Sequence, residues 1–447
     1  MEIQKAENMS SQMRVAPNAD SSVVRAPGQL DIDPQRWPAI AVAPSGATVN
    51  MRARVARRIF RRAVSELPLR VEFPDGTVWG ATSEVETHPR MLLHRPDEFF
   101  RRLGSGALIG FGEAYMAGDW DASDLEAVLE VFASRVASLV PGNLQRLRAF
   151  LVARQPKNER NSTKNTQSNI SRHYDLSNDF FRLFLDETMT YSAALFTDPE
   201  TATLDDLAEA QRRKIDRLLD LAGVTAGSRV LEIGTGWGEL ALRAAARGAT
   251  VHTVTLSTAQ AELAQQRVHQ HGYSDSVTVE ILDYRFVDGQ YDAVVSVEMI
   301  EAVGYQYWTE YFSKIDSVLA PGGKVAIQAI TMPHERMLAT RNTYTWIHKY
   351  IFPGGLLPSV RAIEETTEKF TTLRVDEVFS MGSHYARTLR LWEDHFTATF
   401  DQTRKLGFDD VFRRMWKFYL NYSEAGFASQ YLDVQQILIS RPNESRT

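Results

Sequence analysis

The chain has 447 residues, a formal net charge of −6 and 44% hydrophobic residues, which is typical of a globular protein with two domains. It contains no cysteine, which excludes disulfides, thiol nucleophiles and Cys-ligated metals, and its acidic balance argues against a nucleic-acid partner. No apolar run approaches the roughly 20 residues of a membrane span, and residues 1–20 lack the apolar segment of a signal peptide. We therefore expect a cytoplasmic protein whose contact with a membrane is peripheral.

The N-terminal region predicts a disordered segment followed by a basic helix. Residues 1–48 are rich in Ser, Ala, Pro, Asn and Asp without a period, so we expect disorder. Within 51–64, Met51, Val55 and Ile59 form an apolar stripe on a helix that carries no acidic residue. Six arginines flank this stripe: Arg52, Arg54, Arg57, Arg58, Arg61 and Arg62. The pattern suits an anionic membrane surface, although a solvated helix packed on its own domain shows it too.

Residues 49–150 predict a small α+β domain. Its expected elements are a hairpin around the Pro-Asp-Gly turn of 69–78, a strand at 91–93, and helices at 96–103 and 124–138. The following segment, 151–170, is polar and poor in apolar residues, which indicates a linker. A mobile lid is the alternative, because candidate ligand-binding residues follow directly.

A glycine turn between residues 229 and 239 is the clearest functional signal. An apolar run carrying Glu232 ends in Gly234, Gly236 and Gly238, and a helical pattern begins at once. Glycine permits a positive φ and lets a ligand approach the backbone. The spacing departs from the G-x-G-x-x-G of dinucleotide-binding folds. It resembles the nucleotide-binding turn of S-adenosylmethionine (SAM) methyltransferases, with an ordinary strand-to-helix turn as the alternative.

From residue 171 to 442 the pattern predicts a Rossmann-like α/β domain, a parallel sheet with helices on both faces. An amphipathic helix at 207–222 leads into the glycine turn. The expected strands lie at 229–233, 250–256, 277–282, 291–297 and 324–330, and the expected helices at 239–247, 258–270 and 307–319. Two late strands, near 372–379 and 432–440, are expected to complete the sheet.

The chain resembles the cyclopropane-fatty-acyl-phospholipid synthase family of SAM-dependent methyltransferases. The motifs that carry the resemblance are H-Y-D-L-S-N-D-F-F (173–181), M-T-Y-S (189–192), L-E-I-G-T-G-W-G (231–238), V-T-L-S-x-x-Q (254–260), E-M-I-E-A-V-G (298–304), K-Y-I-F-P-G-G (349–355) and Y-L-N-Y-S-E-A-G-F (419–427). Within the family it is most similar to the branch that makes a 10-methylene-stearoyl chain. The resemblance implies a class I SAM methyltransferase domain, a small N-terminal lipid-binding and dimerisation domain, and a homodimer at the inner face of the membrane.

The resemblance and the motifs together imply a set of cofactor contacts. The expected SAM-binding residues are Tyr191, Ser192, Glu232, Gly234, Gly236, Trp237, Gly238, Leu256, Gln260, Asp283 and Tyr284. Glu232 is expected to orient the turn or to meet the methionine amine, and Ser192 to lie near the carboxylate. Asp283 follows a strand, where it is expected to accept from the adenine amine, with a turn or cap role as the alternative.

The expected chemistry is methyl addition to an alkene, which leaves a carbocation that needs a dry site and a base. In cyclopropane-forming relatives a bicarbonate is held by a Cys, a Glu, a His, a backbone group and a Tyr. The matching positions here are Ala193, Glu301, Gln328, Ile330 and Tyr385, so two of the four side-chain ligands are absent. The resemblance therefore gives little support to bicarbonate binding in this chain.

A second carboxylate, Glu298, lies three residues before Glu301. On a helix the two would share a face, and proximity would raise the pKa of one of them, as a base requires. Ala193, Glu298 and Gln328 are therefore expected to mark a change of product, with a structural role for Glu298 as the alternative. We expect Glu301, Glu298, Tyr385 and Gln328 to be the catalytic residues.

Four aromatic residues, Tyr174, Phe181, Trp346 and Tyr385, are expected to stabilise the cation, although core packing explains each one singly. For lipid contact we expect Tyr174 and four arginines, Arg57, Arg58, Arg61 and Arg62. The predicted function is methylation of oleoyl chains in anionic membrane phospholipid to a 10-methylene product. The alternatives are a cyclopropane synthase and a non-catalytic lipid-binding protein. A separate flavin- or NADPH-dependent reductase is expected to act next.

Overall fold

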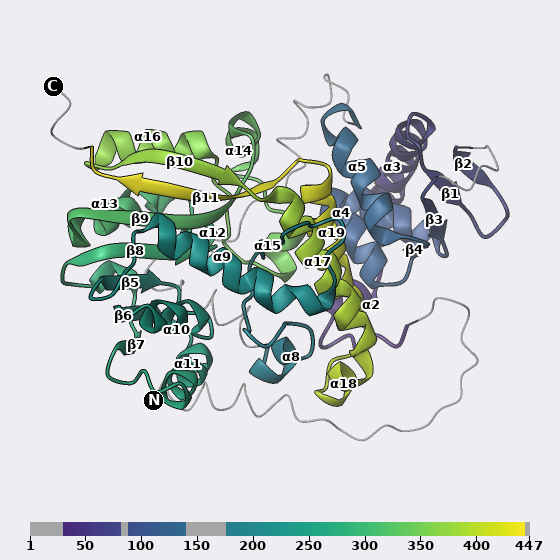
Figure 1. Cartoon of the computed structure of the whole chain (residues 1–447). Helices are drawn as coiled ribbons and strands as arrows, with labels where there is room; N and C mark the ends of the chain where they lie inside the picture. The colour runs from purple at the N-terminus through teal and green to yellow at the C-terminus, as the bar shows by residue number, and fades with distance from the viewer. Residues whose placement is uncertain (1–29, 82–87, 140–175, 443–447) are drawn as a thin grey trace, which may run out of the picture.

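The computed structural model describes residues 30–81, 88–139 and 176–442, which form two sheets and the helices around them (Figure 1). The larger sheet has the order β10-β11-β9-β8-β5-β6-β7. Its strands are β5 (Arg229–Ile233), β6 (Thr250–Thr255), β7 (Val277–Ile281), β8 (Tyr291–Val297), β9 (Leu319–Thr331), β10 (Arg374–Ser380) and β11 (Asp433–Ser440). The strands β5 to β9 pair in parallel, whereas β11 is antiparallel to both β9 and β10. This is the Rossmann-like α/β arrangement that the alternating pattern predicted, and it agrees with the class I methyltransferase domain that the resemblance implied.

Helices cover both faces of this sheet, as expected (Figure 1). On one face, α9 (Leu207–Leu221), α10 (Glu239–Ala246) and α11 (Thr258–Gln270) share an apolar core with the sheet. On the other face, α13 (Trp308–Val318) and α16 (Val360–Phe370) do the same. The carboxyl ends of β5, β6 and β8 therefore meet at one edge, which is where α/β proteins bind ligands.

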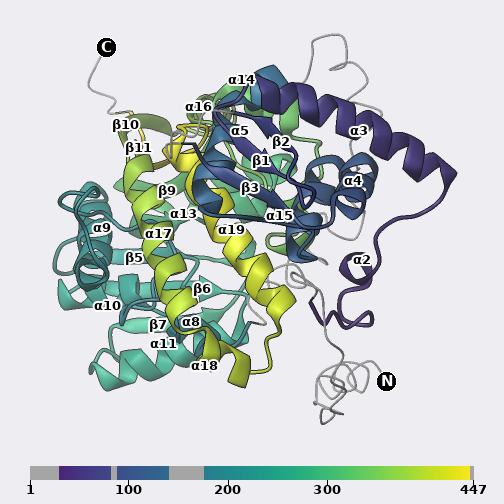
Figure 2. The same cartoon turned by 90° about the vertical axis from the view of Figure 1, so that its right-hand side faces the viewer.

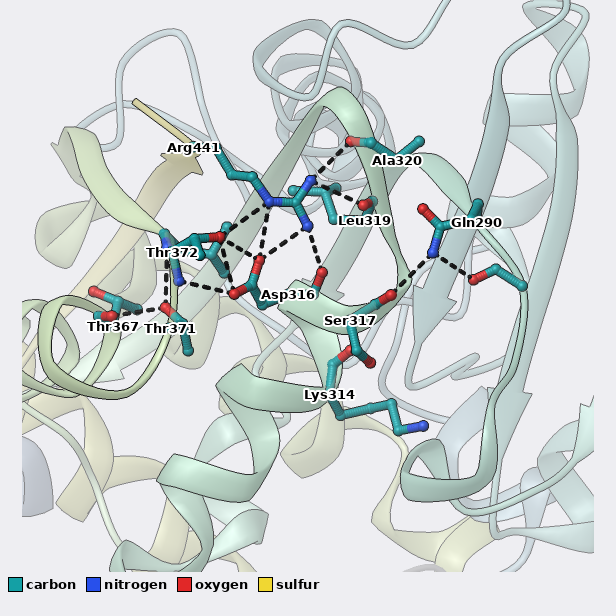
Figure 3. Close-up of polar contacts among 12 residues, drawn as sticks. Gln290, Lys314, Asp316, Ser317, Leu319, Ala320, Thr367, Thr371, Thr372 and Arg441 are labelled. Atoms are coloured by element: carbon teal, nitrogen blue, oxygen red, sulfur yellow. Dashed lines mark hydrogen bonds and ion pairs between the residues drawn. The ribbon is translucent and has the colours of Figure 1, made fainter. Parts of the chain in front are cut away.

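Arg441 fastens the end of β11 to α13 at the opposite edge of the sheet (Figure 3). Its guanidinium donates to the carbonyl oxygens of Leu319 at 3.0 Å and Ala320 at 3.1 Å, and it pairs with Asp316 at 2.9 Å. The backbone N–H of Thr372 donates to the same carboxylate at 2.8 Å. Asp316, Thr372 and Arg441 also line a shallow pocket. Because these charges are paired and satisfy carbonyl groups near a helix end, we assign that pocket a structural role.

The N-terminal module combines helices with a small sheet. It comprises α3 (Ala47–Ser65), β1 (Arg70–Glu72), β2 (Val78–Gly80), β3 (Arg90–Leu93), α4 (Pro96–Met116), β4 (Trp120–Ala122) and α5 (Leu125–Leu139). The strands form a sheet of order β2-β1-β3-β4. The helix predicted at 96–103 continues to Met116 through a kink at Ala107, where φ is 48°. A Cβ atom at Gly110 would lie 1.9 Å from the carbonyl oxygen of Arg102, so only glycine allows the backbone after the kink to pass this close to the backbone before it.

The N-terminal module does not have a core of its own. Its buried residues belong to the same apolar cluster as those of α17 (Gly382–Ala398), α18 (Phe400–Lys405) and α19 (Asp410–Ala428). Figure 2 shows α17 and α19 side by side, and Figure 1 shows them between the module and the large sheet. Buried Arg414 of α19 donates to the carbonyl oxygens of Tyr115 at 2.6 Å and Trp120 at 2.9 Å. The unit assigned to 49–150 is therefore completed by helices more than 200 residues later in the chain.

The prediction of disorder for residues 1–48 is wrong where the structure describes them. Residues Pro38–Ala41 form a short helix, α2, and Ile40 is buried. The guanidinium of Arg102 donates to the carbonyl oxygens of Ala39 and Ile40, both at 2.6 Å. This tertiary anchor outweighs a local composition that favours disorder. The segment 1–29, the linker predicted at 151–170 and Tyr174 lie outside the described residues.

The described residues also form several short elements. They are α8 (Asn178–Arg182), α12 (Ile300–Val303), α14 (His334–Thr340), α15 (Trp346–Tyr350), and three single turns at Leu204–Asp206, Tyr284–Phe286 and Tyr305–Tyr307. Ser177 caps α8, because its hydroxyl accepts from the backbone N–H of Phe180 at 3.3 Å.

Candidate active site

The glycine turn lies between β5 and α10 and needs its three glycines. Gly234, Gly236 and Gly238 have φ of 100°, 51° and 91°, a region that residues with side chains avoid. A Cβ atom on Gly234 would lie 3.2 Å from the side chain of Met299. The turn is therefore a specialised backbone at the carboxyl edge of the sheet, and the N-terminus of α10 follows it.

This turn forms the wall of a pocket that opens to solvent. Nine of the eleven predicted SAM contacts line it: Tyr191, Ser192, Glu232, Gly234, Gly236, Trp237, Leu256, Gln260 and Tyr284. Gly238 and Asp283 do not. The pocket therefore gathers residues from the ends of β5, β6 and β8 and from the segment before α9.

Glu232 presents a carboxyl group to this pocket without a full set of partners. The residue is 3% exposed, and its Oε2 atom accepts no hydrogen bond among the described residues. Burial raises the pKa of the carboxyl to about 8. A cationic group in the pocket would supply the missing partner and restore the ionised form. The ammonium of the methionine portion of SAM has this chemistry, so the residues present fit the cofactor.

We expect Glu232→Gln to stabilise the ligand-free protein at pH 8 and much less at pH 5. With a pKa of about 8 against 4.5 in the unfolded chain, the folded carboxyl holds a proton that the unfolded chain releases. The free energy of unfolding therefore falls as the pH rises from 4.5 to about 8. A glutamine cannot ionise, so the variant does not lose stability over this interval. Scanning calorimetry at both pH values measures it, and an equal change at both would contradict the assignment.

Two polar residues that were predicted to contact SAM have partners within the protein. Asp283 accepts from the backbone N–H of Arg285 at 3.0 Å and from its Nε at 2.9 Å, which is the cap role weighed as the alternative. Gln260 lines the pocket, and its Oε1 accepts from the hydroxyl of Thr255 at 3.1 Å. Ser257 caps α11, because its hydroxyl accepts from the backbone N–H of Gln260.

Lys214 is a pocket residue that we did not predict. It lies on α9, is fully buried, and donates from Nζ to the hydroxyl of Ser192 at 2.6 Å. The sequence does contain a signal for it. Leu207, Gln211, Lys214 and Leu218 follow one another at steps of four, three and four residues, so a charged residue stands on the apolar face of an amphipathic helix.

Three donors hold the carboxylate of Glu298. Its Oε1 accepts from the backbone N–H of Ala193 at 2.9 Å and from Nε2 of Gln328 at 2.8 Å, and its Oε2 accepts from the hydroxyl of Tyr385 at 2.9 Å. Burial raises the pKa of Glu298, while the charge of Lys214 and these donors lower it. Its backbone has φ of 49°, which is rare for a residue with a side chain and marks a constrained site.

Glu301 lies in a different environment. Its Oε1 accepts from the backbone N–H of Ile330 at 2.5 Å, while its Oε2 has no partner among the described residues. Burial and then the charge of Glu298 raise the pKa of Glu301 to about 8. Because α12 begins at Ile300, the two glutamates do not share a helical face, which corrects that expectation. Glu298 lines the SAM pocket and Glu301 does not.

The aromatic residues considered for cation stabilisation are dispersed. The rings of Phe181 and Trp237 lie 4.9 Å apart, so Phe181 packs behind the pocket wall. Trp346 is buried against Phe418 at the junction with the N-terminal module. Neither Phe181 nor Trp346 lines the pocket. Tyr385 alone of the described three contacts a proposed catalytic group.

Comparison with known proteins places this geometry in a family. Residues 161–437, more than half of the chain, match the family described as mycolic acid cyclopropane synthetase. The chain is 55% identical over 413 residues to the tuberculostearic acid methyltransferase of Mycobacterium tuberculosis, covering 92% of this chain and 96% of that protein. This chain belongs to the cyclopropane synthase family.

Two further members support the assignment. The chain is 33% identical over 367 residues to the cyclopropane-fatty-acyl-phospholipid synthase of Escherichia coli, covering 79% of this chain and 88% of that protein. A crystal structure of a mycolic acid cyclopropane synthase complexed with SAH and CTAB superimposes with a TM-score of 0.56 at 32% identity, covering 64% and 98% of the two chains. Membership confirms the predicted enzyme class, a SAM-dependent methyltransferase, and its cofactor.

Proposed function

We propose that this cyclopropane synthase family member methylates the double bond of an unsaturated acyl chain in phospholipid and releases a methylene-branched chain. The observation that carries the proposal is the position of Glu298. Its carboxylate is bound by Ala193, Gln328 and Tyr385, three of the five positions that match the bicarbonate ligands of ring-forming relatives. A carboxylate attached to the protein thus takes the role that bicarbonate has in those enzymes, and no bicarbonate is required.

SAM supplies an electrophilic methyl group, whose addition to the double bond leaves a carbocation on the acyl chain. A hydride shift from the methylated carbon to its neighbour brings the cation to the carbon that bears the methyl group. Loss of a proton from the methyl group then gives a methylene branch, a C=CH₂ double bond on the acyl chain, and Glu298 accepts that proton. Of the two buried glutamates we assign the base to Glu298, because three donors and Lys214 favour its ionised form, which can take a proton, whereas burial and the charge of Glu298 favour the protonated form of Glu301.

The decisive experiment is expression in a host rich in oleoyl phospholipid, followed by mass spectrometry of fatty-acid methyl esters. Methylene-branched and cyclopropane products have the same mass, so mild catalytic hydrogenation is needed before analysis. A methylene product gains two hydrogens and becomes a methyl branch, whereas a ring resists this treatment. Detection of the ring alone would replace our proposal by cyclopropane synthesis. The tuberculostearic acid methyltransferase at 55% identity supports the branched product.

We infer that α3 brings the enzyme to an anionic membrane surface. This helix lies at the outer edge of the molecule, away from the large sheet (Figures 1 and 2). Met51, Val55 and Ile59 are 61%, 54% and 42% exposed, and the helix has no acidic residue. Phe60 and Val64 anchor its other face in the core. In the described part of the chain, no helix combines the length and the apolar character needed to cross a bilayer.

Five of the six arginines of α3 divide into two groups. Arg57 and Arg61 lie over the ring of Trp79 at 5.6 and 5.5 Å, so they also pack on their own module. Arg54, Arg58 and Arg62 are exposed and follow one another at steps of four residues, which places them along one side of the helix. We therefore assign lipid binding chiefly to this second group.

We expect the triple variant in which Arg54, Arg58 and Arg62 are all changed to glutamine to bind phosphatidylglycerol vesicles about 100-fold more weakly. Each arginine near an anionic surface contributes about 1 kcal/mol to the binding free energy. Cosedimentation with vesicles measures the effect, which should shrink as salt is added. A matched control replaces three exposed arginines on other elements, Arg182, Arg229 and Arg361. Equal weakening by both triple variants would contradict a specific role for α3.

A methylene product needs a reductase to become a methyl branch, and we propose that a separate flavin- or NADPH-dependent enzyme performs this step. We also retain the homodimer as part of the proposal. Light scattering of the purified chain tests the dimer, and conversion of the methylene product by a cell extract with added NADPH tests the reductase.

A further inference from the structure

Lys214 is a buried cation without an adequate partner. It is 0% exposed, yet among the described residues its Nζ donates only to the hydroxyl of Ser192, at 2.6 Å. A lysine ammonium carries three donors, and burial without a counter-charge is costly. Burial lowers the pKa of Lys214 to about 8, although the charges of Glu298 and Asp186 act against this. An anion bound close to the ammonium would therefore stabilise it.

The nearby carboxylates do not satisfy Lys214. Both oxygens of Glu298 accept hydrogen bonds from Ala193, Gln328 and Tyr385. Asp186 accepts at Oδ1 from the backbone N–H of Thr188 at 2.8 Å, and its Oδ2 has no partner among the described residues. Neither carboxylate has a hydrogen bond to Lys214 in the structure, so their attraction acts through space. The unused donors of Lys214 are thus available to a ligand.

The same pocket contains the opposite charge. Glu232 and Lys214 both line it, and Glu232 has an oxygen without a partner among the described residues. A pocket that holds one incompletely bonded carboxyl and one incompletely bonded ammonium is complementary to an amino acid, which carries an ammonium and a carboxylate on adjacent atoms. SAM and its product both end in such a group.

We propose that Lys214 binds the α-carboxylate of the methionine portion of SAM, together with the hydroxyl of Ser192, while Glu232 faces the α-ammonium. The assignment rests on the SAM dependence of the family and is independent of the lipid product. Ser192 was expected near this carboxylate, and its contact with Lys214 gives it a charged neighbour there. Lys214 is accordingly a cofactor-binding residue that also acts at a distance on Glu298.

The test compares two ligands by isothermal titration calorimetry in the absence of lipid. One ligand is S-adenosylhomocysteine, and the other is its decarboxylated analogue, S-adenosyl-3-thiopropylamine, which lacks only the carboxylate. The wild-type protein is expected to bind the first roughly ten- to a hundred-fold more tightly, the range for a hydrogen bond to a charged group. Lys214→Met is expected to remove this preference and to change binding of the analogue less than about three-fold.

A matched control is Arg212→Gln, which removes a cation two residues away on the same helix, where Arg212 pairs with Glu187 at the surface. It should leave both affinities unchanged. Equal weakening of both ligands by Lys214→Met, or no weakening of S-adenosylhomocysteine, would overturn the proposal. If that variant does not fold, equal affinity of the wild-type protein for the two ligands overturns it. A wild-type protein that bound neither ligand would refute the cofactor assignment itself, whereas a cyclopropane product would leave this proposal intact.

Discussion

Replacing Glu298 with glutamine is expected to lower the rate of product formation by about 10²- to 10⁴-fold, the contribution of a general base. Glutamine keeps the size and one acceptor oxygen but cannot take the proton. The affinity for S-adenosylhomocysteine should change little, because the carboxylate is bound by Ala193, Gln328 and Tyr385 and not by Glu232 or Lys214. Single-turnover assays with oleoyl phospholipid vesicles measure the rate, and calorimetry measures the affinity.

Two further variants make this prediction specific. Glu298→Gly relieves the positive φ and frees the three donors, so we expect added bicarbonate to restore part of its activity and to leave Glu298→Gln unchanged. Glu301→Gln keeps an oxygen for the N–H of Ile330 and should cost much less. If Glu301→Gln lowered the single-turnover rate strongly and Glu298→Gln lowered it only slightly, Glu301 would be the base and our assignment would be wrong.

The single-turnover rate of the wild-type enzyme should also increase with pH. Burial is the largest influence on Glu298 and raises its pKa above the ordinary value of 4.5. Because the base must be ionised, the single-turnover rate is expected to rise with pH through that raised pKa and then to level off.

Arg414→Met is expected to lower the free energy of unfolding by about 3–5 kcal/mol, the cost of breaking a buried charged contact. The change removes the guanidinium donor from the carbonyl oxygens of Tyr115 and Trp120, and it removes from the carboxylate of Asp121 its partner at 2.7 Å. Since one apolar cluster spans both parts of the chain, we expect a single shifted transition in urea denaturation monitored by circular dichroism.

The neighbouring Arg413 provides the control. It is exposed, and its nearest carboxylate, that of Asp410, is 3.9 Å away, so Arg413→Met should change stability by less than about 0.5 kcal/mol. An Arg414→Met protein in which only the N-terminal module unfolds, as an early separate transition, would show that the module is an independent domain after all.

The sequence was most informative where structure and function are local. The alternation of strands and helices follows from side-chain periodicity, and it located all seven strands of the large sheet to within a few residues. The three glycines of the turn have positive φ, which residues with side chains avoid, so their spacing in the sequence indicated a specialised turn without knowledge of any tertiary contact. Lys214 also had a local signal, a cation on an apolar helix face, but the partner that makes it significant comes from a different segment.

Local composition was misleading where distant contacts decide the outcome. Residues 38–41 read as disordered, yet Arg102 binds their carbonyl groups. The glycine-rich stretch after residue 103 read as a helix end, yet it continues as helix because Phe111 and Tyr115 are buried against other elements. In both segments, long-range burial and hydrogen bonding outweighed a weak local preference.

By itself, the sequence determined the family, the methyltransferase sheet and the glycine turn that indicates SAM, because each depends on periodicity or on residues adjacent in the chain. Only the tertiary structure decided which glutamate is held by three hydrogen-bond donors. Glu298 follows β8, whereas Ala193, Gln328 and Tyr385 come from the segment before α9, from β9 and from α17. No spacing in a sequence encodes that convergence, because it arises when strand pairing and helix packing bring four separate segments to one point.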